Sequence, residues 1–146
     1  MKISVYNRQR SLRVNLPWLR RIAKAALHHC LPHSADGRFA LRALEEVEVA
    51  IVSDEVIADV HDRFMGIPGP TDVITFEHGE IVISAQTAAA YATRYGQALD
   101  HELALYIVHG LLHLNGYEDK TTPDAARMRR LQTRLLRTCL TEVSPL

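Results

Sequence analysis

The stretch EEVEVAIVS, residues 45–53, decides the fold because it is the clearest strand in the chain. The apolar residues Val47, Val49 and Ile51 alternate with charged or small ones. This period of two is typical of a strand with one buried face. The same alternation in KISVYN, residues 2–7, predicts a second strand. Between them, apolar residues recur at helical spacing over 16–31, with Pro17 in the first turn, where proline is favoured. The chain therefore begins strand, helix, strand.

Beyond residue 53 the pattern continues as a mixture of short strands and helices. Ser53 is a good N-cap for a short helix over 54–66. Two β segments follow so closely that they predict neighbouring antiparallel strands: 72–76 and 80–84. The last three predicted elements are helices: 85–96, 98–116 and 123–143. This order indicates an α+β fold, a small mixed β-sheet covered by helices in a single compact domain over residues 1–146.

Composition narrows the classes of protein to consider. The 146 residues are 47% hydrophobic and 23% charged, with a formal net charge of zero, so there is no overall positive field to attract nucleic acid. The first residues lack the apolar core of a secretion signal, and no apolar run approaches the roughly 18 residues of a membrane span, so a cytoplasmic location is expected. Cys30 and Cys139 form no CxxC pair, and reduced buried thiols are the simplest interpretation, with a disulfide left open.

The segment HGLLHLNGYED, residues 109–119, has the features of a metal site. Positions i and i+4 lie on one helical face, so His109 and His113 direct two imidazoles toward one point. Gly116 is placed to end the helix, and Asp119 follows closely enough to fold back. Two histidines and a carboxylate with an open fourth position form a known catalytic zinc arrangement. The alternative is a capping or core role, because eight histidines make chance HxxxH spacings common.

Gly110 lies inside this helix, where glycine costs roughly 1 kcal/mol relative to alanine. Close approach of another backbone or of a substrate would explain it. Gly110 also occupies the position at which the zinc-peptidase motif HExxH carries its general base, which argues against a peptidase. Glu118 is the nearest acid not already assigned as a ligand.

Three segments together resemble the YbeY-type rRNA maturation endoribonucleases: HGLLHLNGYED, GPTDVITF at residues 69–76, and GEIVIS at 79–84. Their order and spacing agree with that family over roughly residues 55–135. The resemblance implies a compact α+β fold with one zinc ion and a cytoplasmic role in small-subunit ribosomal RNA maturation and ribosome quality control. It also implies that His109 and His113 are metal ligands.

The chain departs from the family pattern at several positions. Asp119 stands where the family has its third histidine ligand, and Glu118 where it has an aspartate. A carboxylate ligand lowers the charge of the site from +2 to +1, so a bound water should be acidified less, and the ligand set also suits Fe(II). Met65 matches an arginine of the family and cannot stabilise a phosphate. Arg63, two residues earlier, is a candidate replacement in substrate binding.

Other polar residues have an ordinary interpretation beside a functional one. Thr71 and Asp72 follow Pro70 and are interpreted as a turn bonded to nearby backbone amides. Glu102, seven residues before His109, either orients a metal ligand or is a surface charge. Two basic groups are modest hints of RNA contact, solvated helix faces being the commoner explanation: Arg8, Arg10, Arg13, Arg20, Arg21 and Lys24; and Arg127, Arg129, Arg130, Arg134 and Arg137.

The leading hypothesis is a zinc-dependent endoribonuclease acting on ribosomal RNA of the small ribosomal subunit. His109, His113 and Asp119 would bind the ion, with Fe or another divalent metal as an alternative, and Glu118 would transfer a proton. A catalytically weak or inactive ribosome-binding protein of the same fold is the second hypothesis, and a metallopeptidase-like hydrolase is the third. The sequence leaves open the RNA cleavage position and the oligomeric state.

Overall fold

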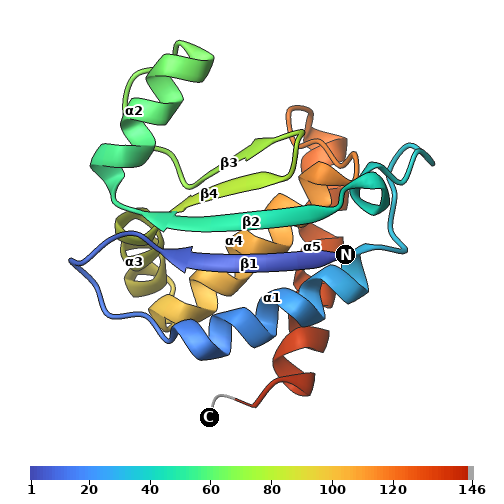
Figure 1. Cartoon of the computed structure of the whole chain (residues 1–146), viewed down its shortest axis with the longest axis horizontal. Helices are drawn as coiled ribbons and strands as arrows, with labels where there is room; N and C mark the ends of the chain where they lie inside the picture. Colours follow the sequence, from blue (N-terminus) through green and yellow to red (C-terminus); the bar gives the residue numbers. More distant parts are fainter. Residues whose placement is uncertain (145–146) are drawn as a thin grey trace.

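The computed structural model describes residues 1–144 and contains a four-stranded mixed sheet in the order β1-β2-β4-β3 (Figure 1). The strands are β1 (Lys2–Asn7), β2 (Glu46–Val52), β3 (Val73–Phe76) and β4 (Glu80–Ser84). β2 pairs in parallel with both β1 and β4, whereas β3 and β4 are antiparallel. The α+β class, the small mixed sheet and the antiparallel pair are therefore confirmed.

Helices cover both faces of this sheet unequally. They are α1 (Leu16–Cys30), α2 (Asp54–Met65), α3 (Ala85–Arg94), α4 (Leu99–Leu114) and α5 (Thr122–Glu142), with a 3-10 turn η1 (Ala40–Ala43). α1 and α4 pack against one face of the sheet, with α3 and α5 against α4, and together they enclose the main apolar core (Figure 1). α2 stands on the opposite side, over a small second core: Val52, Ile57, Ile74 and Val82.

Several local predictions are confirmed. The hydroxyls of Ser53 and Ser84 accept hydrogen bonds from the amides three residues later, at 3.3 and 3.1 Å, and so begin α2 and α3. Cys30 and Cys139 are free and buried, and burial raises the pKa of Cys139 to about 11. No helix within residues 1–144 is both long enough and apolar enough to cross a membrane.

Helix α4 lies against strand β4 so closely that a side chain would not fit at Gly110. A β-carbon there would come within 2.7 Å of the Ile81 Cγ2 methyl. This methyl is attached next to the strand backbone and cannot swing away as the end of a long side chain would. The glycine is therefore explained by helix–sheet packing and not by a bound substrate, and the packing fixes the height of His109 above the sheet.

Gly110→Ala should destabilise the protein by up to about 2 kcal/mol, because overpacking costs about 1–3 kcal/mol and better helix propensity returns only about 1. Urea unfolding of the variant and of the Ile81→Ala and double variants measures this. In a protein that already carries Ile81→Ala, Gly110→Ala should be neutral or stabilising, because the methyl group that would clash with the new β-carbon is absent. A Gly110→Ala protein more stable than the parent would contradict the prediction.

Candidate metal centre

The last turn of α4 and the bend after it bring three potential ligand atoms together. The Nε2 atoms of His109 and His113 are 3.0 Å apart, and Asp119 Oδ2 lies 3.5 Å from each of them. The helix supplies the i, i+4 pair, while Gly116, with a φ of +96°, reverses the chain so that Asp119 returns. Within the described residues, these three form a group able to hold one metal ion.

Each imidazole is held by a hydrogen bond at its other nitrogen. The Nδ1 of His109 lies 2.7 Å from Gln132 Oε1, and the Nδ1 of His113 lies 2.8 Å from the carbonyl oxygen of Tyr117. Both partners are acceptors, so in the neutral rings both Nδ1 atoms carry the proton. Both Nε2 lone pairs then point into the space between the rings.

This donor set fits a divalent cation. Two nitrogen lone pairs 3.0 Å apart repel each other, and the nearby carboxylate adds negative charge, so the cluster is favourable only around a positive centre. Ligands about 2.0–2.2 Å from a tetrahedral zinc ion are separated by roughly 3.3–3.5 Å, close to the separations found here. Fixing the far nitrogens by hydrogen bonds is the usual way in which proteins orient such ligands.

The electrostatics of the site favour the neutral, metal-binding form of His113. Burial lowers the pKa of His113, and neighbouring His109 lowers it further, while Asp119 acts in the opposite direction. A depressed pKa leaves the imidazole unprotonated near neutral pH. No proton then has to be displaced from it when a cation binds.

Gln132→Leu should weaken metal affinity by about 10- to 100-fold, because it removes the acceptor that orients His109. Gln132→Glu keeps an acceptor at the same reach and should retain the affinity, so it is the matched control. Competition with a chromogenic chelator for Zn²⁺ measures both variants. Equal affinity for the leucine and glutamate variants would mean that the hydrogen bond does not orient the ligand.

Two cavities meet at His109 and Gln132. One, of about 210 Å³, is also lined by Asp119 and by the side chain of Arg129 on α5. The other, of about 260 Å³, lies toward β3 and α3, and its further lining is Asp72, Tyr91, Glu102, Leu105 and Tyr106. Sequence pattern alone does not single out Arg129 among the arginines of α5, because it does not show which face of this helix meets α4.

The position of Glu102 agrees with neither of the two roles predicted for it, a surface charge or a group that orients a metal ligand. It is only 9% exposed, so it is not a surface charge, and burial raises its pKa. It does not orient His109 either, because Gln132 occupies that nitrogen. Asp72 agrees with the expected turn, since its carboxylate accepts the Val73 amide at 2.8 Å, but it also lines the cavity beside His109.

The remaining predicted site residues lie apart from these two cavities. Glu118 lines a third cavity with Asp36 and Arg127, although its charge still acts on His113. Arg63 is exposed on α2 and pairs with Asp59 at 3.4 Å. Their proposed roles in proton transfer and substrate binding therefore depend on where an RNA strand would lie.

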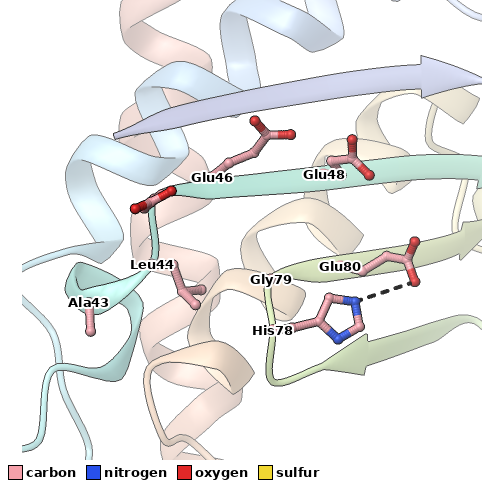
Figure 2. Close-up of a pocket in the computed structure, with 8 residues that line it drawn as sticks. Ala43, Leu44, Glu46, Glu48, His78, Gly79 and Glu80 are labelled. Atoms are coloured by element: carbon pink, nitrogen blue, oxygen red, sulfur yellow. Dashed lines mark ion pairs between the residues drawn. The ribbon is translucent and has the colours of Figure 1, made fainter.

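A larger cavity, of about 510 Å³, contains none of the three clustered ligands. Figure 2 shows its glutamates, Glu46 and Glu48 on β2 and Glu80 on β4, with His78 3.9 Å from the Glu80 carboxylate. These carboxylates would repel RNA phosphates. RNA is therefore expected at the histidines and not in this groove.

Comparison with known proteins places the chain in a family. Residues 4–139 match the family model of the endoribonuclease YbeY. Relatives of that name include proteins from Nocardia farcinica, 36% identical over 68% of this chain and 65% of the relative, and Corynebacterium jeikeium, 34% identical over 93% and 81%. TM1509 from Thermotoga maritima, 21% identical, has the same fold, with a TM-score of 0.64 over 96% of this chain and 90% of its own. The match from strand β1 into helix α5 shows that the chain belongs to the YbeY endoribonuclease family.

Proposed function

We propose that this chain is a metal-dependent endoribonuclease that matures small-subunit ribosomal RNA in the cytoplasm and takes part in ribosome quality control, with residues 1–146 acting as one hydrolase domain. The observation that carries the proposal is the convergence of the lone pairs of His109, His113 and Asp119 in a member of this family. One zinc ion is the first choice of metal, and Fe(II) or another divalent ion is the alternative.

Different residues would bind the metal ion, orient its ligands and transfer a proton during phosphodiester cleavage. When bound, the ion supplies a Lewis acid that acidifies water and polarises a phosphoryl oxygen. The neutral imidazoles of His109 and His113 and the Asp119 carboxylate hold it, and Gln132 and the Tyr117 carbonyl fix the imidazoles. We assign proton transfer to Glu118, whose negative charge acts on His113.

Phosphate binding has to be supplied without the family arginine, because Met65 stands in its place. Arg129 is the best-placed substitute, since its side chain lines the same cavity as His109 and Asp119. A guanidinium there can stabilise the charge that develops on the phosphate oxygens. Arg63 on α2 would contact the RNA backbone further along the strand.

Arg129→Ala should lower kcat/KM for RNA cleavage by about 10- to 100-fold, since preorganised charge at a phosphate is worth several kcal/mol in the transition state. Arg130→Ala is the matched control, because Arg130 is the next residue on the same helix, is exposed and does not line the cavity. Arg63→Ala should have a smaller effect. If Arg129→Ala and Arg130→Ala lose equal activity, only the net charge of α5 matters.

The test of the function is cleavage of structured small-subunit ribosomal RNA by protein stripped of metal and then titrated with Zn²⁺, Fe²⁺ or Mn²⁺. Cleavage should appear with the first equivalent of the effective ion and disappear with a chelator. Absence of cleavage with all three ions, with retained binding to small ribosomal subunits, would replace the nuclease with an RNA-binding protein. Chelator-sensitive degradation of an unfolded protein would point instead to a peptidase.

A further inference from the structure

The cavity on the β3 side of His109 has the size and lining of a small ligand site. Its volume of about 260 Å³ lies just below the range of about 300–1,000 Å³ typical for drug-sized ligands, which suits one flat ring system. It shares His109 and Gln132 with the cavity that contains Arg129. A chain with its phosphate beside Arg129 would therefore place a neighbouring group here.

Within the described residues, the Tyr106 hydroxyl at this cavity is buried and has no partner at full hydrogen-bond distance; the Glu102 carboxyl acts on it from slightly further away. The tyrosine is only 4% exposed, so bulk water does not complete the hydrogen bonding of its hydroxyl. Its neighbour on the next turn of α4 is the Glu102 carboxyl, which is itself 9% exposed. The cavity thus presents a hydroxyl donor and a carboxylate acceptor side by side, in weak contact with each other and both more than nine-tenths buried.

The charge of the cavity selects against phosphate and for a base. Asp72 and Glu102 are acidic, and no lysine or arginine is among the lining residues. A phosphate would be repelled, whereas the N–H groups at the edge of a base would be accepted. Tyr91 is 40% exposed at the cavity, and its ring lies parallel to that of Tyr95, with centroids 6.3 Å apart. Such aromatic faces stack on the unpaired bases of single-stranded RNA.

We propose that this cavity binds one unpaired guanine base of the RNA substrate, next to the cleaved phosphodiester. Tyr106 donates to guanine O6, the Glu102 carboxylate accepts N1–H and N2–H together, and Tyr91 supplies a stacking face. Adenine and cytosine would place a ring-nitrogen acceptor against the carboxylate, and uracil offers it only one donor. The proposal rests on the proposed RNA-cleaving function, to which it adds a base preference.

The test is titration of the full-length, zinc-loaded protein with guanosine, adenosine, cytidine and uridine by calorimetry. Guanosine should bind most tightly, and Tyr106→Phe and Glu102→Gln should each weaken it by roughly 5- to 150-fold, the range for one good base-edge contact. Tyr106→Phe removes only the weak contact between the hydroxyl and the Glu102 carboxyl, so this variant should fold. Glu48→Gln, in the acidic groove of Figure 2, removes the same charge away from the cavity and should bind guanosine like the parent.

The outcomes separate this inference from the nuclease proposal. Guanosine preference that is lost in both cavity variants supports the base site, even if no metal ion restores RNA cleavage. Equal binding of the four nucleosides, or none, overturns it, even if RNA is cleaved efficiently. Displacement of bound guanosine by an unfolded polypeptide, with no displacement by a guanine-containing oligoribonucleotide, also overturns it, because the cavity would then be a peptide pocket.

Discussion

His113→Ala should abolish both metal binding and RNA cleavage. The substitution removes one of the three ligand atoms, and the remaining pair, His109 and Asp119, are 3.5 Å apart with an exposed carboxylate. Two ligands bind a divalent ion far more weakly than three. Without the ion, water keeps its pKa of about 15.7 in place of about 7, so cleavage should fall by at least about a thousandfold.

The measurement pairs elemental analysis of protein purified without a metal-affinity step with cleavage of small-subunit RNA. His78→Ala is the matched control, because His78 is an exposed histidine in the acidic groove and should keep both properties. Circular dichroism should show an unchanged fold for both variants. Full cleavage by the His113 variant would reveal a contaminating nuclease or a different centre.

The sequence was sufficient where the chemistry is carried by neighbours in the chain. The alternation of Val47, Val49 and Ile51 predicted β2, and all three are buried in the main core. The i, i+4 spacing of His109 and His113 made their convergence predictable, because helix geometry fixes it. The short loop through Gly116 limited where Asp119 could lie.

The rest of the site depends on contacts between elements distant in the chain. Gln132 is 23 residues from His109 and reaches it only because one face of α5 meets α4. The same packing selects Arg129 from the arginines of that helix. The sequence pattern of α5 does not predict which of its faces meets α4. Its apolar residues show that one face is buried, but not which element that face packs against.

Gly110 and Glu102 show how a correct observation can leave its cause undecided. The sequence indicated that the glycine needed a close neighbour, but that neighbour is the Ile81 side chain and not a substrate. It also placed Glu102 on nearly the same helical face as His109. The spacing did not predict that Glu102 is buried and lines a cavity, in place of being a surface charge.

Asn115→Ala should lower the free energy of unfolding by about 2–4 kcal/mol, although Asn115 touches neither metal nor substrate. The residue is fully buried at the end of α4. Its amide nitrogen lies 2.7 Å from the carbonyl oxygen of His33 and within bonding reach of two further carbonyls, those of Cys30 and Leu31. Its side-chain oxygen accepts the Leu41 amide at 3.2 Å. Alanine would leave the Leu41 amide and the His33 carbonyl without this partner in the interior, at about 1–3 kcal/mol each, whereas the Cys30 carbonyl still accepts the His33 amide.

The same change should also reach the metal centre. Asn115 joins the segment after α1 to the turn through Gly116, and this turn presents the Tyr117 carbonyl to His113. Asn115→Ala should therefore lower both the free energy of unfolding, measured in urea, and the affinity for zinc. Asn15→Ala is the control. In that control, alanine removes the N-cap of α1 and should cost only about 1 kcal/mol, with zinc affinity unchanged. Equal destabilisation by the two variants would show that the buried network adds no more than one helix cap. Unchanged zinc affinity in Asn115→Ala would show that the turn holds its shape without it.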